Sequence, residues 1–410
     1  MSDPIVSLTN PEFTDDPIRA YAKLREEAPL VRIGFPGGPR VWLVTRNEDV
    51  KAALSDPRLV VDYSNVPGHQ GPSVADQMAA ALDLPDEFVP YVAANMMLKD
   101  GKEHARQRRL ITPAFTVRRM KALRPRVEQI SARLLDALAE KGSGDLIEDY
   151  SSPLTGTVIC DLIGIDEADQ PQVRKWMNEY TAPDADLAAS GQAMVDYIKD
   201  LIERRRAEPR EDMVSALVAA RDENGDRLNE TEIVSVALTT VNNGHHSTSH
   251  FIPTAVLTLF DNPDQLALLR AKPEALPHAI NELMRIANVV PTAGPRYATE
   301  DMEFAGCPIR KGDALTGSYL SANYDPRVFA DPETCDVERV LERGQTHLAY
   351  GAGSHFCPGA ALAGIEGEVA LDHLLLKRDT LEVTIGREQL RYTEATPGGA
   401  RLLDALPVRL

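Results

Sequence analysis

Hydrophobic residues recur at helical spacing over much of the chain. Between residues 127 and 138 apolar side chains fall three or four positions apart, and Gly142 predicts the end of that helix. A longer helix is predicted to begin at Asn229, because Glu232 three residues later completes a capping-box pattern. Its apolar positions continue to about Phe260. A helix of this length is unusual for a globular protein and indicates an element that crosses the middle of the molecule.

Two further features belong to the predicted helices. Pro253 lies inside the long helix and is expected to bend it, because proline lacks the N–H group that would bond to Ser249. A helical stretch is also predicted over residues 360–376. The pattern as a whole predicts a mainly α-helical fold.

Strand signals are confined to short segments. Residues 30–44 predict a hairpin, because apolar extended segments flank a turn rich in glycine and proline at residues 34–39. Residues 301–318 predict a second hairpin that turns at residues 311–313. The stretch from residue 62 to 95 is rich in proline, glycine and aspartate, and it predicts a loop with few regular elements. We therefore expect small β-sheets at the edges of the helical body.

Composition narrows the class of protein. The chain has 410 residues, of which 43% are hydrophobic, and no linker or repeat divides it, so one domain over residues 1–410 is expected. A net charge of −18 argues against a nucleic-acid partner. No apolar run approaches the roughly 20 residues of a membrane span, and the N-terminus lacks the basic and apolar parts of a signal peptide. We expect a cytoplasmic protein that contacts no membrane, whose four cysteines are thiols.

The most informative motif surrounds one of those cysteines. Residues 350–359 read Tyr-Gly-Ala-Gly-Ser-His-Phe-Cys-Pro-Gly, which places Cys357 between glycines and directly before a predicted helix. Glycines let the backbone pass close to a flat cofactor, and the N–H groups at a helix N-terminus favour a thiolate. A thiolate is a ligand of haem iron in enzymes that cleave the O–O bond. An isolated, partly buried cysteine in a turn is the alternative reading, and this spacing disfavours it.

The motif resembles the haem-binding loop of the cytochrome P450 family, Phe-Gly-x-Gly-x-His-x-Cys-x-Gly, with Tyr350 where that family usually has Phe. The resemblance implies the P450 fold, with a long central helix over the haem, and a soluble enzyme of the bacterial type. It also implies haem b as the cofactor, Cys357 as the iron ligand, O2 as a co-substrate and a monooxygenase activity.

Other positions match the family at the expected distances. Glu282 and Arg285 share one helix face and correspond to the family's Glu-x-x-Arg, whose third partner would be Arg339. Charged pairs at this spacing usually lie on a solvated helix surface. The match to the family therefore depends on the order of this pair before Arg339 and Cys357 in the chain.

A second set resembles the family's haem-propionate ligands. His104 and Arg108 are four residues apart, so a helix would place both on one face, and a guanidinium group matches a carboxylate. The resemblance adds Arg296 and His355 to this set. An ordinary basic helix is the alternative for residues 104–108.

The long helix departs from the family where oxygen is activated. The family reads Ala-Gly-x-Asp/Glu-Thr-Thr/Ser, whereas residues 243–248 read Asn-Gly-His-His-Ser-Thr. His246 and Ser247 therefore replace the acid–alcohol pair that carries protons in the family. Histidine has an ordinary pKa of about 6.5, so His246 could still relay protons. Alternatively it faces away, and substrate or water supplies them. A metal site at His245 and His246 is disfavoured, because adjacent helical positions point about 100° apart.

Substrate contacts are inferred from where the family lines its cavity. The candidates are Asn242, Asn243, Val290, Thr292, Ala293 and residues 396–398.

A basic segment predicts a partner surface. From residue 106 to 126 the chain carries eight cationic side chains and no acidic one: Arg106, Arg108, Arg109, Arg118, Arg119, Lys121, Arg124 and Arg126. In the family this segment lies beside the thiolate side of the haem, where an acidic ferredoxin supplied by a ferredoxin reductase docks. A charged helix surface without a partner is the alternative.

The favoured hypothesis is an oxidoreductase that tailors a natural-product scaffold by hydroxylation or oxidative ring coupling. Oxidative C–C or C–N coupling of aromatic cyclic dipeptide-like substrates, with indole or phenol units and without oxygen insertion, is one alternative. A haem-binding sensor or carrier without turnover is the other. The intact Cys357 motif and the basic segment favour the enzyme.

Overall fold

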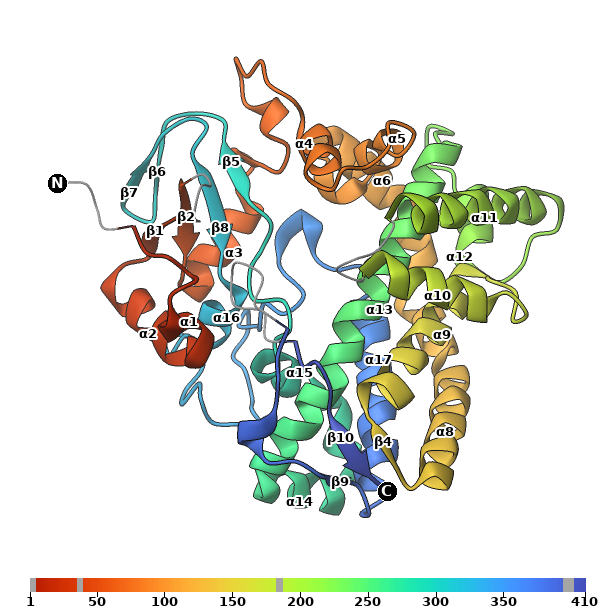
Figure 1. Cartoon of the computed structure of the whole chain (residues 1–410). Helices are drawn as coiled ribbons and strands as arrows, with labels where there is room; N and C mark the ends of the chain where they lie inside the picture. The colour runs from red at the N-terminus through yellow and green to blue at the C-terminus, as the bar shows by residue number, and fades with distance from the viewer. Residues whose placement is uncertain (1–4, 35–39, 182–186, 394–401) are drawn as a thin grey trace.

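A computed structural model describes residues 5–34, 40–181, 187–393 and 402–410. A largely β region lies on one side and a larger helical region on the other, and helix α13 (Glu230–Asp261) runs through the middle (Figure 1). This is the mainly α-helical fold with small sheets that the sequence predicts. A single domain over residues 1–410 stays a prediction.

The helices that surround α13 have the following bounds: α1 (Pro11–Asp15), α2 (Pro17–Glu27), α3 (Asn47–Ser55), α4 (Val74–Ala81), α5 (Val89–Ala93), α6 (Gly101–Ile111), α7 (Val117–Ala122), α8 (Arg124–Lys141), α9 (Ser152–Ile163), α10 (Gln170–Thr181), α11 (Leu187–Ala207), α12 (Met213–Ala219), α14 (Pro263–Ala271), α15 (Leu276–Ile286), α16 (Tyr319–Asn323) and α17 (Ala360–Leu371). Within the described ranges, none of the helices has both the length and the apolar character needed to cross a membrane.

The largest sheet has the strand order β1 (Leu30–Gly34), β2 (Arg40–Val44), β8 (Ala314–Gly317), β5 (Arg296–Ala298) and β3 (Leu59–Val60). Strands β1 and β2 form the predicted antiparallel hairpin, with Leu30 opposite Val44. The smaller sheets contain β4 (Ser143–Asp145), β10 (Pro407–Arg409) and β9 (Glu382–Val383), and β6 (Met302–Phe304) with β7 (Cys307–Ile309).

The predicted turn of the second hairpin is wrong. Strands β6 and β7 pair with Phe304 opposite Cys307, so the chain turns at Ala305 and Gly306, both with positive φ (48° and 78°). Two central residues with positive φ suit the right-handed twist of a hairpin. Residues 311–313 instead lead into β8, which pairs with β2 and β5.

The segment from residue 62 to 95 is also more regular than predicted. It contains α4 and α5. The Ser73 side chain caps α4 and the Asp76 carboxylate caps it in return, so a capping box was present in the sequence of this segment.

The central helix begins as the sequence predicts. Asn229 and Glu232 form the capping box. The helix continues without a break through Pro253, which lacks the N–H group that Ser249 would otherwise bond. The Ser151 hydroxyl donates to the freed Ser249 carbonyl oxygen at 2.7 Å. A residue outside the helix therefore satisfies the acceptor that proline leaves open.

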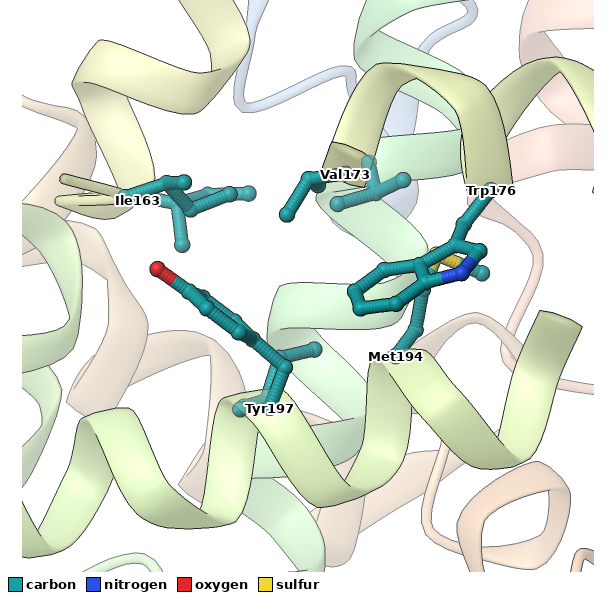
Figure 2. Close-up of a pocket in the computed structure, with 8 residues that line it drawn as sticks. Ile163, Val173, Trp176, Met194 and Tyr197 are labelled. Atoms are coloured by element: carbon teal, nitrogen blue, oxygen red, sulfur yellow. The ribbon is translucent and has the colours of Figure 1, made fainter. Parts of the chain in front are cut away.

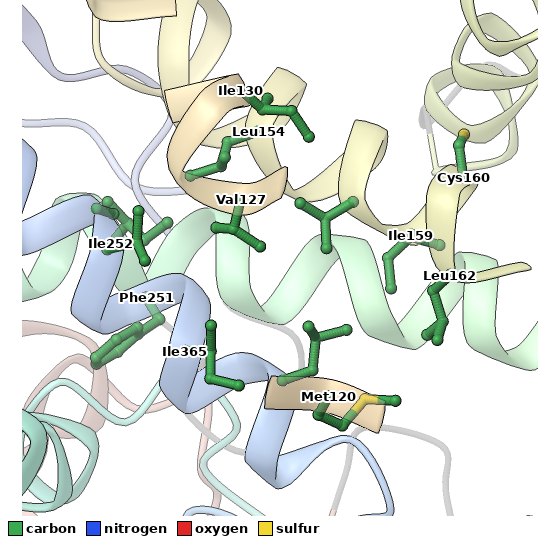
Figure 3. Packing of buried hydrophobic residues seen from close by; sticks show 14 of the residues in the cluster. Met120, Val127, Ile130, Leu154, Ile159, Cys160, Leu162, Phe251, Ile252 and Ile365 are labelled. Atoms are coloured by element: carbon green, nitrogen blue, oxygen red, sulfur yellow. The ribbon is translucent and has the colours of Figure 1, made fainter. Parts of the chain in front are cut away.

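The core lies where four helices meet. Val127 of α8, Ile159 of α9 and Ile365 of α17 gather around α13 (Figure 3). A Cβ on Gly367 of α17 would lie 2.8 Å from the ring of Phe251 in α13, so the glycine permits this close approach. Helix α17 follows the cysteine motif as predicted. Residues 372–376 continue directly from it as a π-helical turn.

Candidate active site

The loop before Cys357 is held by glycines against α3. Gly351 and Gly353 have φ values of 69° and 71°, which favour glycine. A Cβ on Gly353 would lie 2.5 Å from the carbonyl oxygen of Leu54. The backbone N–H of Cys357 donates to the carbonyl oxygen of Tyr350 at 3.0 Å. These contacts fix the cysteine at the entry to α17.

Opposing effects act on the Cys357 sulfur. Burial is the largest and raises the pKa of the thiol. The N–H groups of Gly359 and Ala360 and the charge of Arg108 favour the thiolate and lower the pKa. The N–H groups predicted at the start of the helix therefore do face the sulfur, and burial opposes their effect. The charge of a coordinated metal ion is what deprotonates such a thiol.

Four polar side chains from distant segments meet beside this loop. The rings of His104 (α6) and His355 stack with centroids 3.9 Å apart. Nη2 of Arg108 donates to the carbonyl oxygen of Phe356 at 2.7 Å. Arg296 is the first residue of β5 and is buried, as is His104.

This cluster fits an anionic ligand. Nε2 of His104 and Nε of Arg296 are buried, and neither has a hydrogen-bond partner within the described part of the chain. Burial, followed by the neighbouring His104, Arg296 and Arg108, lowers the pKa of His355 to about 3, so its ring is neutral at neutral pH. Burial also lowers the pKa of Arg108 and Arg296, yet arginine keeps its charge. The carboxylates of a bound group would pair with the arginine charges and accept hydrogen bonds from these buried nitrogens.

The three residues of the predicted triad, Glu282, Arg285 and Arg339, are in contact in the structure. Arg285 binds both carboxylate oxygens of Glu282 at 2.7 Å, and Nε of Arg339 donates to Oε1 of Glu282 at 3.0 Å. Arg285 also donates to the carbonyl oxygens of Asn323 and Pro332. The triad therefore fastens the loop that precedes the Cys357 motif to α15.

The adjacent histidines of α13 face different surroundings. His245 is buried, and its Nδ1 lies 2.9 Å from the Thr155 hydroxyl of α9. Burial lowers the pKa of His245 to about 4. The His246 ring instead lies near the ring of His250, with centroids 4.7 Å apart, and burial lowers its pKa as well. The Ser247 hydroxyl donates to the Asn243 carbonyl oxygen at 3.0 Å.

The predicted substrate positions fall into two groups. Nδ2 of Asn243 lies 3.2 Å from the Met97 sulfur, which places the short helical turn of residues 96–98 against α13. Asn242, on the same helix, is partly buried.

The second group runs beside β8. The Ala293 N–H donates to the Gly317 carbonyl oxygen at 2.8 Å, and Thr292 pairs with Ser318. Val290, just before them, is 40% exposed. The candidates at residues 396–398 lie outside the described residues.

Two residues of the region were missed from the sequence. Met97 has no local signal, because its contact with α13 depends on the fold. His250 could have been found, because it follows His246 by four residues and so shares its helix face.

An apolar pocket lies apart from these residues. Ile163, Trp176 and Tyr197 point into it from α9, α10 and α11 (Figure 2). It contains none of the predicted site residues.

Residues 106–126 present fewer unpaired cationic side chains than their sequence indicates. Several of its arginines are paired with carboxylates: Arg106 with Glu103, Asp226 and Glu232, Arg109 with Asp222, Arg124 with Glu128 and Glu368, and Arg126 with Asp161 and Glu167. Arg118 and Lys121 of α7 have no ion pair among the residues that the structure describes. Val117 of α7 is 58% exposed, and Phe356, whose carbonyl oxygen accepts from Arg108, is 44% exposed.

Comparison with known proteins identifies the family. Residues 181–390 match the sequence model of the cytochrome P450 family. The chain is 39% identical to 6-deoxyerythronolide B hydroxylase of Saccharopolyspora erythraea, and the match covers 99% of both chains. It is 38% identical to mycinamicin IV hydroxylase/epoxidase of Micromonospora griseorubida over 91% of each. The ligand-free P450 monooxygenase TamI has a similar structure, with a TM-score of 0.87 and 36% identity over 100% of this chain and 94% of that one.

The chain therefore belongs to the cytochrome P450 family, as its Cys357 motif indicates. It is a monooxygenase of the haem-thiolate class that uses O2, a small-molecule substrate and electrons from a redox partner.

Proposed function

We propose that this monooxygenase hydroxylates a large natural-product scaffold and that its cofactor is haem b held by Cys357. His104, Arg108, Arg296 and His355 would receive the propionates. Arg108 and Arg296 supply charge, and His104 and Arg296 have buried nitrogens with no partner among the described residues. Bound haem supplies the oxidising chemistry. Hydroxylation is supported by relatives whose names specify hydroxylation of 6-deoxyerythronolide B and hydroxylation or epoxidation of mycinamicin IV.

The site residues bind and orient the substrate and move protons. Asn243 offers a polar group beside the apolar Met97, and such a mixture suits a scaffold that is mostly hydrocarbon with a few oxygens. His246 is neutral at neutral pH, because burial lowers its pKa, so it can accept a proton on one ring nitrogen and donate from the other. Ser247 holds its hydroxyl against the Asn243 carbonyl oxygen. We propose on this basis that His246 relays protons within the site.

Product analysis under 18O2 tests the reaction class. Substrates are first selected by spectral titration of the loaded enzyme against macrolactones, cyclic dipeptides and simple aromatics. Incorporation of one 18O atom into the product supports hydroxylation. A dehydrogenated, ring-coupled product without 18O would establish the coupling alternative instead. If every compound that binds leaves NADPH consumption at the rate measured without substrate, the protein is a haem-binding carrier instead.

Substitutions at His246 test the relay. His246→Ala should lower product per NADPH and raise hydrogen peroxide, because general acid–base groups contribute roughly 10²- to 10⁴-fold. The double variant His246→Asp with Ser247→Thr restores the family pair and should keep coupling near the wild-type value. If His246→Ala binds substrate normally and leaks no additional peroxide, the relay is excluded. Weaker substrate binding without leakage would assign His246 to the substrate pocket.

We also propose an acidic ferredoxin, reduced by a ferredoxin reductase, as the electron donor. Arg118 and Lys121 carry unbalanced charge, and Val117 and Phe356 provide exposed apolar surface. Cations beside an exposed apolar side chain, as Arg118 and Lys121 are beside Val117 on α7, suit a small acidic redox protein. None of the four cysteines forms a disulfide, which supports work in the reducing cytoplasm.

A further inference from the structure

His250 extends the face of α13 that carries His246. The two residues are four apart, and their ring centroids are 4.7 Å apart with planes tilted by 51°. Both side chains are partly buried. Two imidazoles this close can exchange a proton across one water molecule.

The surroundings of His250 leave it free to take part in such an exchange. Its Nδ1 atom is buried, with no hydrogen-bond partner in the described portion of the chain. Burial, together with the nearby His246, lowers the pKa of His250 to about 4, and the Asp404 carboxylate opposes this by raising it. The ring is therefore neutral at neutral pH, with one nitrogen to accept a proton and one to donate it.

Asp404 is an exposed carboxylate whose charge reaches His250. It is exposed, and it lies on the C-terminal segment next to Leu403, which pairs with Tyr392. The Thr393 hydroxyl donates to Oδ1 of Asp404 at 2.9 Å and the Asp404 N–H donates to the Arg391 carbonyl oxygen, so the carboxylate is held in place. An exposed carboxylate that influences a buried imidazole is a suitable entry point for protons.

The neighbouring His245 cannot serve the same purpose. Its Nδ1 is engaged by Thr155, and the ring packs against α9 rather than toward His250. Of the three histidines in this part of α13, only His246 and His250 share a face and a close ring contact.

We propose that Asp404 and His250 form the outer part of a proton path that leads from solvent to His246. The proposal rests on the relay role of His246 stated above. Asp404 takes a proton from solvent. The proton then passes across a bridging water molecule to one nitrogen of His250. His250 releases the proton on its other nitrogen to His246, which releases one toward the substrate pocket. One proton enters and one leaves, and no residue is oxidised or reduced.

Three variants of the loaded enzyme separate the members of the path. His246→Ala interrupts the inner end, and His250→Phe keeps a ring of similar size without nitrogens. Asp404→Asn removes the charge and keeps the oxygen that accepts from Thr393. His278→Gln is the control, because His278 is exposed on α15 and glutamine can still donate to the Arg339 carbonyl oxygen. Hydrogen peroxide per NADPH is measured for each with saturating substrate.

We expect His250→Phe to give at least half of the peroxide increase of His246→Ala, and the two combined to give no more than His246→Ala alone. Asp404→Asn should give a smaller increase, and the control none. Wild-type peroxide in His250→Phe, with a clear increase in His246→Ala, overturns this proposal and leaves the relay role of His246 intact. No increase in either variant overturns both. If His250→Phe loads haem poorly, His250→Gln is compared instead, per loaded enzyme.

A second measurement does not depend on turnover. The His250 pKa is followed by NMR of its ring signals in the reduced, carbon monoxide-bound protein. Asp404→Asn should lower this pKa, because the carboxylate raises it in the wild type. An unchanged His250 pKa removes Asp404 from the path.

Discussion

Arg108 donates a hydrogen bond to the carbonyl oxygen of Phe356, one residue before the proposed iron ligand Cys357, with 2.7 Å between the two atoms. The contact joins α6 to a loop 248 positions later in the chain. Arg108 therefore connects the proposed propionate ligands with the Cys357 loop, since its charge also favours the thiolate of Cys357.

Removal of this guanidinium should weaken haem retention. Arg108→Ala and Arg296→Ala each delete a charged donor worth about 1.5–3 kcal/mol, so haem loss should be faster by about ten- to hundredfold. Haem per protein and the rate of haem transfer to apomyoglobin measure this. Arg109→Ala is the matched control, because that neighbouring arginine pairs with Asp222. Haem loss at the wild-type rate in both variants would contradict the propionate role.

Replacement of the proposed iron ligand should change the absorption spectrum of the haem-loaded protein. Cys357→Ser should abolish the long-wavelength Soret band of the reduced carbonyl complex, because only thiolate pushes enough electron density onto iron. Cys307→Ser, at another cysteine that is not fully buried, should keep the band. A band that survives in Cys357→Ser would exclude this residue as the ligand. The band should also persist in whatever fraction of Arg108→Ala stays loaded.

The pattern of ion pairs predicts which cations guide a redox partner. Arg118→Gln and Lys121→Gln should slow electron transfer from an acidic ferredoxin severalfold at low ionic strength, and high salt should remove the difference. Arg124→Gln should have less effect, because Glu368 already offsets the charge of Arg124. Arg119 donates to the Asp212 carbonyl oxygen and is also less available. Stopped-flow reduction at several salt concentrations measures this, and a salt-independent effect would argue against docking at α7.

Buried neutral histidines should make the fold sensitive to acid. The pKa of His245 is about 4 in the folded protein, below its ordinary value of about 6.5. As pH falls from 6.5 toward 4, the unfolded chain takes up a proton that the folded protein does not. The free energy of unfolding therefore falls by up to about 1.4 kcal/mol per pH unit for this residue.

His245→Gln should make that decline shallower by up to the same amount, since glutamine can still bond to Thr155 and does not titrate. Urea denaturation of the haem-loaded protein at pH 7, 6 and 5 measures the slope. His278→Gln, at the exposed position, should leave the slope unchanged. Equal slopes for wild type and His245→Gln would contradict the depressed pKa.

The sequence by itself determined the features that depend on neighbouring residues. The capping box of Asn229 and Glu232, the end of α8 at Gly142 and the pairing of Glu282 with Arg285 each involve groups within four residues. The Cys357 motif belongs to the same class, because its glycines and the following helix are contiguous. Backbone hydrogen bonds and side-chain spacing along one element are encoded locally, so these features could be predicted.

Only the tertiary structure decided which distant groups meet. The carboxylates that offset Arg109 and Arg124, Asp222 and Glu368, lie more than a hundred positions away. The contact of Asn243 with Met97 likewise joins segments that no local signal connects. Burial is also a property of the folded chain, and at Cys357 it opposes the N–H groups of the helix N-terminus. Desolvation and long-range pairing depend on what the whole chain packs around a residue, and spacing along the sequence does not contain that information.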